Sequence, residues 1–183
     1  SYFFDKTFDI WRRELLKRTG FRIIVAVLLT GMLTLSIPHV GPAHAFEASG
    51  TIYVRSSGLV DPSTAPILRN GSLYTLTDKI AVNADGIVIE KDDIVLDGAG
   101  CAIEGPEGWT GIMLMRRNNV TIRNMEIKGF SDGIYFDGSS HISICGNNIT
   151  TNIGGGVGLF SSSYSIISGN TITNNGRGIG VFL

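Results

Sequence analysis

The chain has 183 residues, of which 24 are glycine and 17% are charged, and its formal net charge at pH 7 is −1. This length suggests one domain, and the abundance of glycine with few charges favours a turn-rich β structure. The part beyond Ala45 holds nine basic and thirteen acidic residues, a net charge of −4, and its one basic cluster is Arg116-Arg117. Such a charge pattern excludes nucleic acid as an expected partner.

Residues 1–45 are predicted to be an N-terminal extension followed by an export signal. A basic segment at 17–22 precedes an uncharged apolar run at 23–37, and Ala43-His44-Ala45 has the small residues that signal peptidase recognises. The alternative is an uncleaved signal anchor, and in both cases the basic residues send the remainder out of the cytoplasm. We therefore expect an extracellular, cell-surface or periplasmic protein that contacts a membrane only through this segment, if it stays uncleaved.

Residues 46–82 are predicted to form an N-terminal cap. Two stretches, 51–54 and 72–76, have the composition of short strands, and a proline-punctuated loop at 58–66 separates them. The first coil of a repeat structure needs its apolar interior covered, so its terminal unit departs from the repeat.

Residues 83–183 contain a sequence repeat. The phrase NVTIRNMEI at 119–127 returns as HISICGNNI at 141–149 and as YSIISGNTI at 164–172. Within each copy the apolar residues lie two apart, which is a strand period, and glycine, asparagine and serine fill the gaps. Matched apolar positions recur every 22 or 23 residues in five columns: Val120/Ile142/Ser165, Ile122/Ile144/Ile167, Ile127/Ile149/Ile172, Ile134/Val157/Ile179 and Phe136/Leu159/Val181.

One such copy cannot bury its own apolar side, so successive copies must stack at the strand spacing of about 4.8 Å. The predicted fold is all-β, a parallel β-helix of single-stranded coils, and the chirality of parallel connections favours a right-handed one. An earlier coil is expected to turn Ile94, Leu96, Ile103, Ile112 and Leu114 inward, with a loop at 105–110. Asn147 and Asn170 follow glycines at equivalent positions and predict a short stacked ladder. Because Leu183 falls inside a predicted strand, we expect further coils to follow it.

The two cysteines of the exported part are predicted not to form a disulfide. Alternation points Cys101 inward and Cys145 outward, in coils that are not neighbours. Cys101 is therefore expected to be a small core residue and Cys145 a surface thiol.

The phrases IVLDGAGCAIEG, NNVTIRNMEIKGFSDGIYF and SIISGNTITNNGRGIGVF resemble the right-handed β-helix repeats of the NosD type. These repeats are grouped with carbohydrate-binding and sugar-hydrolase (CASH) domains and have a pectin-lyase-like fold. The resemblance covers roughly residues 50–183, and it specifies fold better than function because many activities share this coil geometry. It implies an exported protein, and the namesake of the family is associated with copper maturation of nitrous oxide reductase.

The first functional hypothesis is a surface scaffold that binds polysaccharide or glycan. A parallel sheet presents ladders of like side chains at a repeat near the length of a sugar residue. Trp109, Tyr135 and Tyr164 are the candidate residues for stacking on sugar rings.

The second hypothesis is a polysaccharide lyase or glycoside hydrolase, which needs paired carboxylates or a carboxylate-bound Ca²⁺ with a base nearby. Asp132 and Asp137 are the candidates, although alternation predicts different environments for them. Asp92, Asp93 and Asp97 also cluster, where Asp93 and Asp97 suit turns better than catalysis. No carboxylate occurs after Gly138, so the catalytic residues of an enzyme would lie partly outside this chain.

The third hypothesis is a NosD-like copper accessory role, for which His141 and Cys145 are the candidate ligands, with methionines at 113, 115 and 125. On an extended strand, His141 and Cys145 would lie about 13 Å apart on one face. That spacing does not support chelation of copper, and no cofactor is predicted.

Overall fold

A computed structural model describes residues 45–182, and every regular element among them is a β-strand. The predicted signal or anchor lies outside the described residues, apart from Ala45 at its end. Between 45 and 182 no helix is long and apolar enough to cross a membrane.

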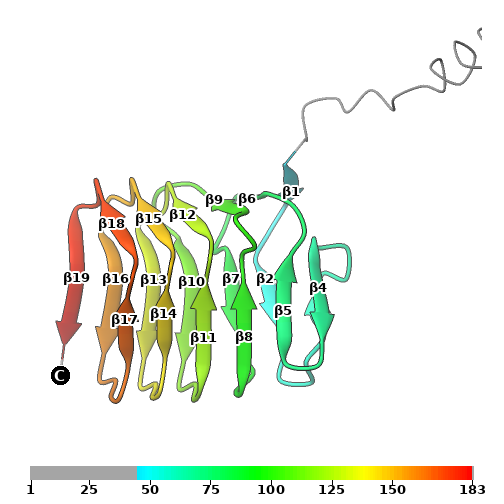
Figure 1. Ribbon diagram of the computed structural model, residues 1–183. Coiled ribbons are helices and arrows are strands. Elements are labelled where there is room, and N and C mark those ends of the chain that lie inside the picture. Colours follow the sequence, from blue (N-terminus) through cyan, green and yellow to red (C-terminus); the bar gives the residue numbers. More distant parts are fainter. Residues whose placement is uncertain (1–44, 183) are drawn as a thin grey trace, which may run out of the picture. The chain divides into compact units, whose positions relative to one another are not determined.

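The strands form three sheets (Figure 1). The first sheet contains β1 (Phe46–Ala48), β6 (Ile80–Val82), β9 (Ala102–Glu104), β12 (Glu126–Lys128), β15 (Asn148–Thr150) and β18 (Thr171–Thr173), in that spatial order. The second contains β19 (Arg177–Phe182), β16 (Gly155–Phe160), β13 (Asp132–Asp137), β10 (Thr110–Met115), β7 (Ile87–Ile89), β2 (Ile52–Val54) and β3 (Val60–Asp61). The third contains β17 (Ile166–Ser168), β14 (Ser143–Cys145), β11 (Val120–Arg123), β8 (Ile94–Asp97), β5 (Leu73–Leu76) and β4 (Ile67–Asn70).

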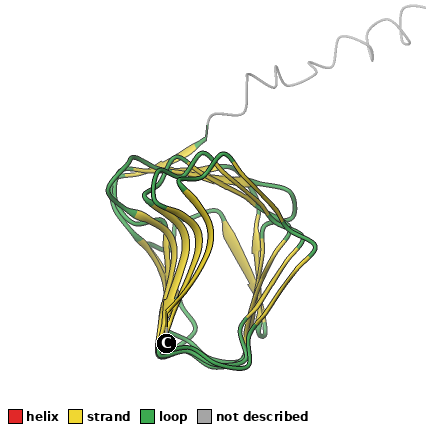
Figure 2. Ribbon diagram, turned by 90° about the vertical axis from the view of Figure 1, so that its left-hand side faces the viewer, coloured by secondary structure: helices red, strands yellow, loops and turns green. Residues whose placement is uncertain are grey.

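Each coil contributes one strand to each sheet in turn, so that the coils form three sides around a common interior (Figure 2). Strands that neighbour each other within a sheet are parallel, except for the antiparallel pairs β2–β3 and β4–β5. Ile122 pairs with Ile144, which pairs with Ile167, in the register that the sequence repeat predicts. The structure therefore confirms an all-β parallel solenoid.

The predicted apolar columns fill the interior. Ile144 and Ile149 are fully buried, and Leu159 is 9% exposed. In the earlier coil, all five residues predicted to point inward are at most 2% exposed. Val181 in β19 is 60% exposed, because β19 is the last described strand of its sheet and is covered on one side only.

Residues 46–82 contribute β1, β2 and β5 to the three sheets, so this segment contains a coil of its own. The antiparallel strands β3 and β4 are inserted between β2 and β5 and lie at the edges of the second and third sheets. The hydroxyl of Tyr74, which is fully buried, donates a hydrogen bond of 2.8 Å to the Gly58 carbonyl and ties this insertion to the interior.

Two asparagine ladders link equivalent turns of successive coils. The side chain of Asn147, 2% exposed, donates to Asn170 at 3.0 Å and accepts from the Met125 backbone N–H at 3.2 Å, which confirms the predicted stacking. The residues that adopt the left-handed conformation are the preceding glycines, Gly146 and Gly169, whose φ angles are 66° and 62°.

The corner between the first and second sheets varies in length. The interval from Ile127 to Ile134 is seven residues and that from Ile149 to Val157 is eight, whereas the corresponding intervals from the third to the first sheet are both five. In the preceding coil this corner carries the loop 105–109 between β9 and β10, close to the predicted loop. Coil length is thus adjusted mainly at one corner of these later coils.

Candidate functional site

The candidate copper ligands do not converge. His141 was expected on a strand face, but it precedes β14 and has a φ of 55°, so it belongs to a left-handed turn. Its ring stacks on Tyr164 at 5.3 Å, and Nδ1 lies 3.1 Å from Oδ1 of Asn118. Cys145 ends β14, and both cysteines are half-buried free thiols. Within residues 45–182, no three His, Cys, Asp or Glu side chains come together to hold a metal ion.

The methionines do not complete such a site either. Met113 and Met115 lie on β10, where the inward positions are occupied by Ile112 and Leu114. Met125 is 2% exposed and packs in the core.

The three candidate sugar-stacking residues occupy three separate places. Trp109, 45% exposed, lies in the loop before β10, and Tyr164, 79% exposed, lies in the turn before β17. Tyr135 is half-buried on the outer face of β13. The structure does not bring them together into one binding surface.

Asp132 and Asp137 both lie on the outer face of β13, so the expected difference between their environments is wrong. Alternation fails because Gly133 and Ile134 are both buried, which returns Asp137 to the same side as Asp132. Five residues of strand separate their Cα atoms by roughly 16 Å. Paired carboxyl groups of glycoside hydrolases lie about 5 to 9.5 Å apart.

The cluster of Asp92, Asp93 and Asp97 holds turns together, as predicted for the last two. Asp93 Oδ1 accepts from Asn119 Nδ2 at 2.9 Å. Asp97 accepts from the Ala99 backbone N–H and from Arg123 Nε, both at 2.9 Å.

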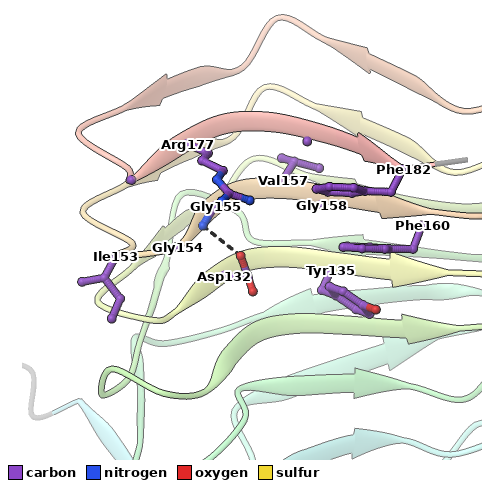
Figure 3. Close-up of a pocket in the computed structure, with 12 residues that line it drawn as sticks. Asp132, Tyr135, Ile153, Gly154, Gly155, Val157, Gly158, Phe160, Arg177 and Phe182 are labelled. Carbon is purple, nitrogen blue, oxygen red and sulfur yellow. Dashed lines mark hydrogen bonds between the residues drawn. The ribbon is translucent and has the colours of Figure 1, made fainter.

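A groove lies on the outer face of the second sheet, over β13, β16 and β19 (Figure 3). Its volume is about 380 Å³, within the range of small-molecule sites. Gly158 and Gly180 pair with each other in register and follow Tyr135 in the same column, so two successive coils place no side chain there. Gly155 likewise adds no side chain to the column that it shares with Asp132 and Arg177. We call this site the glycine groove.

Three neighbouring aromatic rings form one side of the glycine groove (Figure 3). The ring centroids of Tyr135 and Phe160 are 4.9 Å apart, and those of Phe160 and Phe182 are 4.3 Å apart with an interplanar angle of 9°. Phe160 pairs in register with Phe182, so the stacking follows directly from the coil repeat.

Asp132 and Arg177 border the groove where β13, β16 and β19 begin. Oδ1 of Asp132 accepts a hydrogen bond of 2.8 Å from the Gly155 backbone N–H, which fixes the carboxylate (Figure 3). Arg177 is exposed and has no ion pair with another described residue. The groove thus has a hydrogen-bond acceptor, Asp132, and a donor, Arg177, at one end, and aromatic side chains at the other.

Sequence reasoning identified Tyr135 and Asp132 but missed Phe160, Phe182 and Arg177. The signal was present in GGVGLF at 155–160 and RGIGVF at 177–182, which align glycine with glycine and phenylalanine with phenylalanine. Considering exposed aromatics one at a time hides a site that is made of stacked positions.

Comparison with known families gives one match over most of the chain. The model of the family described as periplasmic copper-binding protein (NosD) matches residues 49–181. Neither a curated protein nor a solved structure matches the chain. The matched region covers the solenoid almost from end to end, and it includes both asparagine ladders and the residues of the glycine groove except Phe182. The chain therefore belongs to the NosD family.

Proposed function

We propose that this protein is an accessory factor for copper-site maturation outside the cytoplasm. The observation that carries this proposal is the family match over residues 49–181, because the NosD family is described as periplasmic and copper-binding. A solenoid with a fully packed interior suits such a role as a rigid scaffold.

The described side chains do not fit a copper chelate. His141 is engaged with Asn118 and Tyr164, and no three His, Cys, Asp or Glu side chains cluster in the part of the chain that the structure describes. Copper in a protein needs several nitrogen or sulfur ligands within reach of one ion. We therefore propose that these coils present a surface and do not themselves coordinate the ion.

Deleting the gene in the native host tests this proposal. The copper content of exported copper enzymes, measured per polypeptide by mass spectrometry of purified fractions, should fall and should recover with the wild-type gene. The double variant His141→Ala/Cys145→Ser should restore copper equally well, because these residues are not ligands in the proposal. Unchanged copper content after deletion would reject the accessory role, and failure of the double variant would reject the view that the coils do not bind the ion.

A second candidate function is glycan binding, which the glycine groove favours. Its glycine floor lets a flat ring approach the sheet, and the aromatic side and polar end match the mixed character of a sugar. Hydroxyl groups of a sugar can donate to Asp132 and accept from Arg177. The proposal moves the sugar site from the three separate aromatics to one face of the second sheet.

Binding of soluble oligosaccharides, followed by calorimetry, tests this candidate with a blocked groove. In Gly158→Val the new Cβ would lie 3.4 Å from Phe160 and 3.6 Å from Tyr135, which are ordinary contacts, so the fold should persist while the groove fills. Gly50→Val serves as the control, because its Cβ meets nothing within 4 Å. Equal binding by both variants would place any glycan site elsewhere.

We also propose that residues 1–45 direct export, that the mature protein starts at Phe46, and that the solenoid is right-handed. The handedness follows the general rule for parallel crossovers, and the export follows the basic and apolar pattern at 17–45. N-terminal sequencing of exported protein would test the cleavage site, and recovery of an intact N-terminus in membranes would favour an anchor.

A further inference from the structure

Phe160 offers a ring edge to a ligand in the glycine groove, because both of its faces lie against neighbouring rings, those of Tyr135 and Phe182. A Cβ built on Gly158 would be nearest to Cε2 of Phe160 and Cδ2 of Tyr135, and one built on Gly180 would be nearest to Cε2 of Phe182. These are edge carbons, so edges overhang the glycine floor. The edge of an aromatic ring carries partial positive charge, whereas the face is negative. The aromatic side therefore favours ligand oxygens over a sugar face stacked on a ring.

The donors of the groove are better placed for a ligand than its acceptor. Asp132 already accepts from the Gly155 N–H at 2.8 Å, whereas the guanidinium of Arg177 donates to no described residue. Arg177 is also exposed, so a ligand can reach it. A guanidinium presents a planar fork of N–H donors that matches the oxygens of a carboxylate or sulfate.

Tyr135 also lines the groove, and its phenol hydroxyl is a second donor. Burial raises the pKa of Tyr135, and the charges of Asp137 and Asp132 raise it further, so the phenol stays protonated. Within residues 45–182 this hydroxyl makes no hydrogen bond to another side chain or to the backbone.

The spacing of the polar groups suits a ring that carries a charge at one side. Asp132 and Arg177 stand in one column with Gly155 between them, two coil steps or about 9.6 Å apart along the solenoid. A ring in the groove beside this column can present hydroxyl groups to Asp132 and an acidic substituent to Arg177.

We propose that the glycine groove selects an acidic sugar, a pyranose that carries a carboxylate or a sulfate, with Arg177 as the contact for the acid group. This inference rests on the second proposed function, glycan binding in the groove, and names its ligand class. The free oxygen of Asp132 accepts a ligand hydroxyl, and the edges of Phe160 and Phe182 border the remaining oxygens.

Calorimetric titration with four matched ligands tests the selection: a uronate oligosaccharide, its methyl ester, the neutral parent oligosaccharide and a sulfated one. Wild-type protein should bind the uronate or the sulfated ligand at least about tenfold more tightly than the neutral parent, which corresponds to about 1.4 kcal/mol. Arg177→Gln should abolish this difference, because it lowers affinity for the acidic ligands more than affinity for the neutral one, and Arg177→Lys should restore part of it. The preference should also weaken as salt is raised, since the contact is exposed.

The outcomes separate this inference from the function on which it rests. Equal binding of acidic and neutral ligands, blocked by Gly158→Val, would overturn the acid preference and keep glycan binding. Acid preference that survives in Arg177→Gln would also overturn the role of Arg177. No binding of any ligand would overturn both proposals. Thermal unfolding of each variant, with a midpoint like that of the wild type, shows that a loss of binding is not a loss of fold.

Discussion

The side-chain nitrogen of Asn152 lies 2.9 Å from Oδ1 of Asn175, the residue that occupies the same place one coil further along. Asn152 is fully buried, and its own Oδ1 accepts from the Phe130 backbone N–H at 3.1 Å in the preceding coil. Its nitrogen also donates to the Ile127 carbonyl at 3.3 Å. The carboxamide of Asn152 therefore forms hydrogen bonds with the backbone of the preceding coil and with the side chain of Asn175 in the next coil.

Replacement of Asn152 should cost much of the stability of the solenoid. Asn152→Leu leaves the Phe130 N–H buried without its side-chain acceptor and removes one hydrogen bond from the Ile127 carbonyl, and we expect the free energy of unfolding to fall by about 2 to 4 kcal/mol. Urea unfolding followed by circular dichroism measures this loss. Asn148→Ser in the neighbouring strand is the control, because Asn148 is exposed and its side chain makes no hydrogen bond within the described chain. Equal stability of the two variants would contradict the ladder.

Substitution of Gly133 or Gly156 by a larger residue should also destabilise the solenoid. A Cβ on Gly133 would lie 2.6 Å from Cγ2 of Ile149 and 2.7 Å from the Gly156 carbonyl oxygen, and Gly156 has a similar contact with Gly178. The Gly156 carbonyl belongs to the backbone and cannot shift as the end of a flexible side chain can. Gly133→Ala should therefore lower the free energy of unfolding by about 1 to 3 kcal/mol. A Cβ on Gly178 meets nothing within 4 Å, so Gly178→Ala should leave the stability almost unchanged. Thermal unfolding of the two variants beside the wild type measures both effects.

The free energy of unfolding should fall in acid, in part because Asp97 becomes protonated. Burial acts to raise the pKa of this carboxyl, but hydrogen bonds from Ala99, Asn124 and Arg123 outweigh it, so its pKa lies below the ordinary 3.8. A lowered pKa means that the contribution of Asp97 is complete above 3.8 and is lost as the pH falls through the folded-state value.

Urea unfolding at a series of pH values tests this contribution. Asp97→Asn should be less stable than the wild type by a constant amount at neutral and mildly acidic pH, and the two proteins should converge below pH 3.8. A difference that persists unchanged in strong acid would show that Asp97 acts through its shape and not through its charge.

Cys101 should react slowly with alkylating reagents while the protein is folded. Burial raises the pKa of its thiol, with a further contribution from Asp78, so less of the reactive thiolate is present at a given pH. In the Cys145→Ser background, iodoacetamide labelling followed by mass spectrometry should be slower than labelling of glutathione and should accelerate in urea. Labelling as fast as glutathione in the native state would mean that Cys101 is open to solvent.

The interior of this protein was predictable because a parallel solenoid repeats its register. Once Ile122 aligns with Ile144, alternation decides which side chains face inward, and a slip of one residue would expose every one of them. The same logic located the Asn147 and Asn170 ladder. It missed the second ladder at Asn152 and Asn175, because these asparagines follow Thr151 and Asn174, and the glycine that marked the first pair is absent.

The outer face was harder to predict, for two physical reasons. Strict alternation breaks where both Gly133 and Ile134 face inward, which changes the side on which Asp137 emerges. His141 leaves the strand altogether, since its left-handed backbone places the ring in a turn against Tyr164. Local backbone conformation decides such positions, and periodicity does not report it.

The corner of variable length gives this solenoid a way to diversify. The extra position between Ile149 and Val157 falls beside Ile153 and Gly155, where the charged end of the glycine groove begins. A codon gained or lost at this corner would reshape the rim around Asp132 and Arg177 while the buried columns keep their alignment. Related solenoids can therefore differ in the ligands they bind while they keep the same fold.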